Sequence, residues 1–321
     1  MPGGTRRRKK RRSELRNLLE FAGVVCGASA LRSLPPRLAV RFCGAVSGVL
    51  LSRVLRRHRR RAFENLTRVF GDTLPDSEKR RLVHRVFEGL GRTAAEFALV
   101  PRLGLEAFHV TPDPATEQIR RRLLATGRPV IFVQAHLGAW EILAMKASSL
   151  GFPLHAAARP IDNPRLDSWV RSVRQTGDCQ KVNIEKEFYS YTVDALNHGY
   201  SVGCMGDQAR RHRPIFVPFL GIPAATTRLP ALLALKTGAP LVPVCAPRVA
   251  TDFEYALHFG EPIYGSSQAP LEEELVRLTR SFTLVLEGWI RRYPDQWLWT
   301  HRRWKVSREA VAESLRASYV P

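Results

Sequence analysis

The residues best suited to chemistry in this 321-residue sequence are a histidine and a glutamate five positions apart, His136 and Glu141. An apolar run typical of a buried strand precedes them, and a helical pattern follows. In an open α/β sheet, ligands collect at the carboxyl ends of the strands, so we expect His136 to face a ligand. A histidine accepts a proton from a hydroxyl near neutral pH, and a carboxylate fixes its useful tautomer. The spacing predicts a general base oriented by Glu141.

The same two residues also fit a surface histidine beside an unrelated glutamate, and the spacing alone leaves that alternative open. The sequence contains neither a G-x-x-x-x-G-K-[ST] phosphate loop nor an H-E-x-x-H zinc helix. Residues 89–94 match a dinucleotide fingerprint in form, but a helical pattern precedes them where that motif needs a strand. We therefore expect a direct group transfer without a covalent enzyme intermediate, a metal ion or a cofactor.

The composition suits a globular protein with a buried core, but the charge is strongly positive. Hydrophobic residues make up 45% and charged residues 25%, while 50 Lys and Arg against 29 Asp and Glu give a net charge of +21. The excess is concentrated before residue 62, where Glu14 and Glu20 are the only acids. Such a region attracts nucleic acid or anionic lipid. The five cysteines are widely spaced, which indicates reduced thiols rather than a disulfide framework or a structural zinc site.

The N-terminal region alternates basic and apolar segments. A basic run from Arg6 to Arg12 precedes two uncharged segments, residues 21–31 and 42–52, separated by Pro35-Pro36. Neither segment reaches the roughly 20 apolar residues that a membrane-spanning helix needs. We expect two short helices on one membrane face, with their basic flanks on anionic lipid. A marginal single span, a cleaved signal peptide and an ordinary pair of core helices remain alternatives.

The body of the chain alternates predicted strands and helices after a helical region at 57–100. Strands are expected at 129–134, 154–158, 201–205, 240–245 and 253–259, the last at a sheet edge, and helices at 119–124, 164–176, 188–198, 226–237 and 272–292. Residues 214–225 are expected to form a loop. The alternation predicts an α/β fold with a mainly parallel central sheet flanked by helices. We divide the chain into a basic tail (1–14), a membrane-associated basic helical region (15–61), an α/β domain (62–306) and a C-terminal tail (307–321).

Several segments, in order along the chain, resemble the motifs of one protein family. Besides the H-x4-E pair, they are Asn65-Leu66, Arg159-Pro160 with Asn163-Pro164 and Asp167, Gly206-Asp207-Gln208, and residues 216–226, 241–244 and 294–305. Residues 38–306 resemble the bacterial lipid A biosynthesis acyltransferases, a lauroyl and myristoyl transferase group within the glycerolipid-type acyltransferases. Ala139, where many members have asparagine, and the basic residues after Gln208 depart from the family pattern.

The resemblance implies that a fatty acyl group moves from a thioester to a hydroxyl of a lipid A precursor. The donor would be acyl carrier protein or acyl-CoA, and the enzyme would work on the cytoplasmic face of the bacterial inner membrane. His136 is then the general base, with Glu141 orienting it. Backbone N–H groups near Leu137 and Gly138, or the side chain of Arg159, would stabilise the oxyanion.

The resemblance also implies four substrate-binding residues: Arg159, Asp207, Gln208 and Arg228. The two arginines suit the phosphates of the acceptor, and Asp207 would position Arg159 or the acceptor. An acyl groove is expected along Trp140, Phe216, Phe219 and Leu220. One alternative is acylation of another glycolipid, such as a phosphatidylinositol mannoside, from acyl-CoA. A more distant alternative is a basic nucleic-acid-binding protein, although no binding module is recognisable and we expect no nucleic acid partner.

Overall fold

A mixed seven-stranded sheet forms the centre of the protein in the computed structural model, which describes residues 13–158, 160–177, 180–183, 188–209, 213–249 and 252–305. Its strands, in the spatial order β1-β9-β8-β2-β5-β3-β4, are β1 His109–Pro112, β9 Glu254–Phe259, β8 Leu241–Ala246, β2 Ile131–Gly138, β5 Ser201–Met205, β3 Leu154–Ala158 and β4 Gln180–Asn183. Strand β9 runs antiparallel to β8, and the other neighbours pair in parallel. The predicted α/β class is confirmed.

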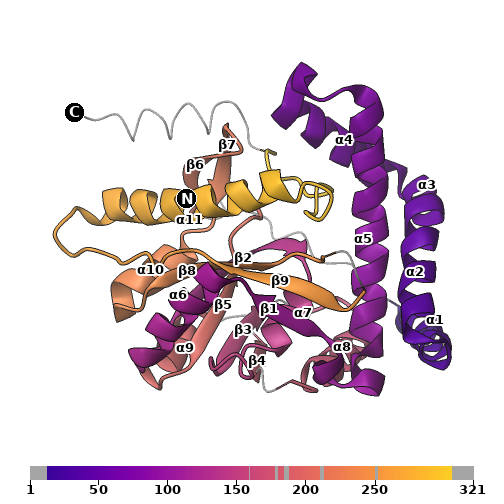
Figure 1. The fold of residues 1–321 in the computed structure, drawn as a ribbon, viewed down its shortest axis with the longest axis horizontal. Coiled ribbons are helices and arrows are strands. Elements are labelled where there is room, and N and C mark those ends of the chain that lie inside the picture. Colours follow the sequence, from indigo (N-terminus) through magenta and orange to yellow (C-terminus); the bar gives the residue numbers. More distant parts are fainter. Residues whose placement is uncertain are drawn as a thin grey trace.

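Helices cover both faces of this sheet (Figure 1). They are α6 Pro114–Ala125, α7 Trp140–Met145, α8 Pro164–Arg174, α9 Phe188–Asn197, α10 Leu229–Thr237 and α11 Leu271–Arg292. Residues of β2 alternate between two cores, because successive side chains of a strand point to opposite faces. Ile131 and Val133 join the core under α9, α10 and α11, and Phe132 joins the core formed with α6, α7 and the second half of α5.

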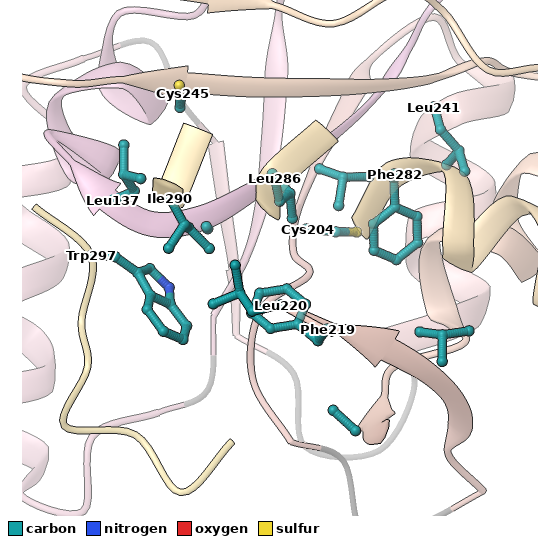
Figure 2. Packing of buried hydrophobic residues seen from close by; sticks show 14 of the residues in the cluster. Leu137, Cys204, Phe219, Leu220, Leu241, Cys245, Phe282, Leu286, Ile290 and Trp297 are labelled. Carbon is teal, nitrogen blue, oxygen red and sulfur yellow. The ribbon is translucent and has the colours of Figure 1, made fainter. Parts of the chain in front are cut away.

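The core under α9, α10 and α11 packs behind the carboxyl end of β2. Figure 2 shows Leu286 and Ile290 of α11 gathered with Leu137 of β2 and with Trp297, and the Cys204 thiol lies in the same cluster. All five side chains are nearly inaccessible to solvent. Burying a large apolar side chain contributes about 1.5–3 kcal/mol, so this cluster fixes the position of the strand ends against α11.

The N-terminal helices form a separate layer beside the sheet. They are α1 Glu14–Ser33, α2 Pro36–Val46, the π-helical η1 Ser47–Leu51, α3 Ser52–Val54, α4 Arg56–Phe70 and α5 Asp76–Leu103, with short 3₁₀ turns η2 Gly71–Thr73 and η3 Leu105–Ala107. The helices α1 to α3 lie on the side of α5 that faces away from the sheet (Figure 1). Arg41 of α2 anchors this layer by donating to Asp252 at 2.8 Å. The predicted boundary between the basic helical region and the α/β domain, after residue 61, falls inside α4. This division of the chain stays a prediction.

Among the described residues, no single helix is long and apolar enough to cross a membrane. One pair of helices, Pro36–Val54 and Arg56–Thr73, passes the same test of length and hydropathy when taken together, with a bend of 98° between them. The expected membrane association of these helices stays a prediction.

Three features differ from the sequence-based prediction. The segment expected to be a loop is a β-hairpin of β6 Ile215–Phe219 and β7 Ile222–Thr226. Its two-residue turn has positive φ at both Leu220 and Gly221, as a type I′ turn requires, and leucine is not a residue that signals such a turn. Strand β9 is not at the edge, because β1 pairs with it. Strands β1 and β4 were not predicted, because a strand of four residues is too short to give a periodic signal.

Candidate active site

The structure brings His136 and Asp207 together at the carboxyl ends of two neighbouring strands. Strand β2 pairs with β5 in a register that ends with Gln134 opposite Met205, and His136 and Asp207 each lie two residues further along the chain. One carboxylate oxygen of Asp207 lies 2.9 Å from Nδ1 of His136, and the other accepts the backbone N–H of His136 at 2.8 Å. Backbone and side chain of the histidine are thus held by one carboxylate.

Asp207 is fully buried and is surrounded by N–H donors. Besides the two groups of His136, the indole N–H of Trp297 donates to it at 2.8 Å. Burial alone would raise the pKa of Asp207, but the neighbouring imidazoles of His136 and His301 and the N–H donors of His136 outweigh it and hold the pKa well below its usual range. The ionised carboxylate favours the tautomer of His136 that carries its proton on Nδ1. The lone pair is then on Nε2.

Two further residues surround the free nitrogen of His136. The side-chain amide nitrogen of Gln208 lies 3.2 Å from Nε2 of His136 and 3.3 Å from Nε2 of His301. The rings of His136 and His301 are 4.9 Å apart between centroids. Burial, reinforced by the positive charges of Arg303 and Arg61, lowers the pKa of His301 to about 4, although Asp207 opposes the shift. His301 is therefore neutral near pH 7.

The C-terminal segment that carries Trp297 and His301 is fixed from two sides. The amide of Asn65 on α4 donates to the carbonyl oxygens of Trp299 at 2.7 Å and of His301 at 2.9 Å. The fully buried guanidinium of Arg303 donates to the carbonyl oxygen of Ala225 at 2.8 Å and to Thr226 Oγ1 at 2.7 Å. Sequence reasoning recognised this segment as a family block but missed His301 and Arg303 as parts of the site. Their place beside Asp207 depends on contacts between residues far apart in sequence.

Glu141 does not contact the imidazole as the H-x4-E spacing had suggested. Its carboxylate accepts from Nε of Arg174 on α8 at 2.7 Å and also from Nη2 of that residue. The chain does not fold back after His136, because helix α7 begins at Trp140 and its first turn directs Glu141 toward α8. The position expected for Glu141, beside Nδ1, is occupied by Asp207.

Gly138, whose backbone N–H was expected to bind an oxyanion, and its neighbour Ala139 already donate to backbone partners. The N–H of Gly138 donates to the carbonyl oxygen of Gln296 at 3.2 Å, and that of Ala139 to the carbonyl oxygen of Ala246 at 2.8 Å. Gly138 has a positive φ of 63°, and a Cβ atom there would lie 2.2 Å from the Ala246 oxygen. Only glycine fits this position, so Gly138 shapes the end of β2 rather than supplying a free donor.

The remaining sequence-predicted site residues are more scattered. Arg228 pairs with Glu272 at the start of α11, at 2.6 Å. Arg159 lies outside the described residues. Phe219 and Leu220 are buried in the core and do not line a groove, whereas the ring of Trp140 lies 5.5 Å from that of His136.

The geometry argues against two other chemistries, a serine nucleophile and a metal site. Residues 199–203 spell G-x-S-x-G, but Ser201 opens β5 rather than following a strand, and its buried hydroxyl accepts the N–H of Val130 at 3.2 Å. It is therefore no nucleophile elbow. Ligand atoms of His136, Asp207 and His301 lie within 4.8 Å of one another, close enough to hold a metal ion. The Asp207 oxygens already accept three N–H groups, which suits an orienting carboxylate better than a metal ligand.

An apolar groove of about 570 Å³ begins next to this site. It lies between α1, α5 and α8 and shares Leu90, Thr93 and Trp140 with the narrow hollow in front of His136. Gly23 and Gly27 of α1 line the groove, and a Cβ atom on either glycine would meet nothing within 4 Å. The groove thus adjoins the hollow and is open beside α1.

Comparison with known proteins agrees with the family read from the motifs. Residues 5–306 match the family described as bacterial lipid A biosynthesis acyltransferase. The chain is 27% identical over 275 residues to the lipid A biosynthesis lauroyltransferase of Escherichia coli (strain K12), covering 84% of this chain and 85% of that protein. It is 26% identical over 267 residues to the lipid A biosynthesis palmitoleoyltransferase of the same strain and to a lipid A biosynthesis acyltransferase of Shigella flexneri, each covering 83% of this chain and 84% of the relative. These matches favour neither the phosphatidylinositol mannoside nor the nucleic-acid alternative. The chain belongs to the bacterial lipid A biosynthesis acyltransferase family.

Proposed function

We propose that this protein transfers a fatty acyl group from an acyl thioester to a hydroxyl of a lipid A precursor, with His136 as the general base. Membership of the family supports the reaction class and the acceptor. The observation that carries the proposed chemistry is the imidazole of His136, which is held at Nδ1 by a buried carboxylate and lines a hollow next to an apolar groove.

In the proposed reaction, Nε2 of His136 accepts the proton as the acceptor oxygen attacks the thioester carbonyl carbon. The tetrahedral intermediate collapses by breaking the carbon–sulfur bond, and the imidazolium returns the proton to the leaving thiolate. Asp207 stabilises the imidazolium, since its carboxylate stays ionised throughout. General base catalysis of this kind contributes roughly 10²–10⁴ in rate.

We assign the binding of the developing oxyanion to the side-chain amide of Gln208. Its nitrogen lies 3.2 Å from Nε2 of His136, the atom that the reacting hydroxyl must approach. When the acceptor hydroxyl displaces the amide from Nε2, an N–H of Gln208 becomes available for the thioester oxygen. His301, being neutral, adds no positive charge that would disfavour the imidazolium.

For Glu141 we propose a supporting role at the entrance to the groove. Glu141 and Arg174 line the groove together with Trp140, and their bidentate pair joins α7 to α8. The H-x4-E spacing then serves the binding of the acyl chain, while Asp207 orients the base.

The groove between α1, α5 and α8 is proposed to hold the acyl chain of the donor. Its lining is mostly apolar, and it meets the hollow of His136 at Trp140. A chain lying there places its thioester carbonyl in front of His136. Acyl carrier protein, which is acidic, is the donor that best suits a chain of net charge +21, and acyl-CoA is the alternative.

We also propose that α1 to α3 rest on the cytoplasmic face of the inner membrane. Large apolar side chains of these helices face solvent, among them Leu15, Leu19, Leu38, Phe42 and Val54, each more than half exposed. Exposed apolar residues flanked by arginines are typical of helices that lie in the membrane interface. The alternative is a membrane span made by the bent pair Pro36–Val54 and Arg56–Thr73.

The test is acyl transfer by the detergent-solubilised protein from labelled acyl carrier protein and, separately, acyl-CoA to a tetra-acylated lipid A precursor. We expect transfer that falls by at least about a hundredfold in His136→Ala. His198→Ala is the matched control, because His198 is an exposed histidine at the end of α9. Transfer at normal rate by His136→Ala would refute the assignment of the base. Failure of both donors with folded wild-type protein would refute the proposed acceptor.

A further inference from the structure

A second cavity of about 570 Å³ lies between α4 and α5, and arginines make up half of its lining residues. Arg56, Arg59 and Arg60 of α4 form one side, and Arg80 and His84 of α5 form the other. None of its lining residues also lines the hollow of His136 or the acyl groove. It is therefore a separate site.

The spacing on α4 explains why the arginines meet at this cavity. Positions 56, 59 and 60 are related by three and four residues, so their side chains share one face of the helix. A neighbouring face of α4 points to the active-site segment, where Arg61 donates to the carbonyl oxygen of Thr300 at 3.1 Å and Asn65 to that of His301. Helix α4 therefore contacts the cavity on one face and the segment that contains His301 on another.

The charge in this cavity is largely uncompensated. Among the residues that the structure describes, Arg60 pairs with Glu64 at the surface, and Arg56, Arg59 and Arg80 form no ion pair. The guanidinium of Arg80 lies 5.8 Å from the ring centroid of Phe63, stacked on the cavity wall. Like charges three or four residues apart on a helix repel each other, so an anion bound between them would relieve that repulsion.

The surroundings of the cavity indicate what kind of anion fits. Phe63 and Val83 add apolar surface to its lining. Ser52 also lines the cavity. Near it in the chain, Leu51 and Val54 are apolar residues that are 40% and 68% exposed. Arginine forks match phosphate oxygens, and the adjoining apolar surface suits a hydrocarbon chain. We propose that this cavity binds the phosphate group of a lipid.

Two lipids offer that chemistry, namely a phosphorylated glycolipid acceptor and a phospholipid of the bilayer. Only the first depends on the proposed acyl transfer, which makes the two sources separable by experiment. The protein is tested as the full chain, with Arg56→Gln/Arg59→Gln as the cavity variant. The matched control is Arg57→Gln/Arg68→Gln, which removes the same charge from exposed positions of α4 outside the cavity.

The first measurement is the KM for a phosphorylated and for a dephosphorylated lipid A precursor in detergent micelles. The second is co-sedimentation with phosphatidylcholine vesicles with and without phosphatidic acid. If the cavity binds the acceptor, the cavity variant raises KM about tenfold for the phosphorylated precursor alone, with kcat unchanged. If it binds bilayer phospholipid, the variant loses the preference for phosphatidic acid while KM stays the same. Either result supports the proposal.

Equal behaviour of the cavity and control variants in both measurements would overturn the proposal, because the arginines would then act only through net charge. Arg80→Gln provides a second cavity variant from the opposite wall and must shift the same measurement as the α4 variant. Circular dichroism and thermal unfolding establish that each variant is folded. If the wild-type protein transfers no acyl group to any precursor, the proposed function fails, but vesicle binding still decides whether the cavity takes a lipid phosphate.

Discussion

Replacing Asp207 with asparagine tests which of two carboxylates, Asp207 or Glu141, orients the base. The two oxygens of Asp207 accept three N–H groups, two of them on Oδ2, from the backbone of His136 and the indole of Trp297. Asparagine has a single acceptor oxygen, which must face these two donors. Its NH2 group then faces Nδ1 of His136 and forces that nitrogen to act as the acceptor. The proton moves to Nε2, where the base needs its lone pair.

The expected loss follows from this change of tautomer. We expect kcat/KM to fall by about 10²–10⁴, which equals about 3–5 kcal/mol of transition-state stabilisation. The Glu141→Gln variant leaves the contacts of His136 intact and only weakens the pair with Arg174, so its kcat/KM should fall by no more than about tenfold. Asp207→Asn should therefore lose more activity than Glu141→Gln, whereas the H-x4-E spacing implies the opposite order.

The assay is kcat/KM for acyl transfer measured across pH 5–9 in the wild type and both variants. We expect Asp207→Asn to lower kcat/KM without a matching loss of thermal stability, which a purely structural defect would not do. Thermal unfolding controls for folding. Near-normal transfer by Asp207→Asn, together with a collapse of activity in Glu141→Gln, would refute the orientation of His136 by Asp207.

Three other predictions concern the groove and the segment around the base. Gly27→Leu should fill the open space beside α1 and shift acyl preference to shorter chains, measured by competition between thioesters of different length; unchanged preference would remove α1 from the groove. Because burial lowers the pKa of His301 to about 4, the unfolded chain binds a proton that the folded chain does not between pH about 6.5 and 4. Stability should therefore fall on acidification through that window, by at most about 3 kcal/mol, and urea unfolding of His301→Gln should lack this component. Asn65→Ala leaves two carbonyl oxygens without donors and should lower the free energy of unfolding by about 1–3 kcal/mol, whereas a smaller change would mean that water replaces the amide.

Local patterns predicted much of the sheet and its helices. The apolar run at β2 and the alternation of strands and helices set the α/β class, and the bounds of β3 and β5 agree with those expected from the sequence. The hairpin of β6 and β7 was missed, since its turn places a leucine at positive φ. Such a conformation is set by the contacts of the folded chain, not by the propensity of the residue.

The site shows the same division between local and long-range information. His136 was found because a strand followed by a helix places a polar residue at the ligand-binding edge, which is a local property. Its partner was assigned to Glu141 because a sequence displays near neighbours, whereas Asp207 is 71 residues away. That contact requires two facts that a single sequence does not display, namely that β5 lies next to β2 and that the two strands end at the same edge of the sheet. Because β5 lies beside β2, Asp207 comes within hydrogen-bond distance of His136, so the orienting carboxylate is a consequence of topology rather than of motif spacing.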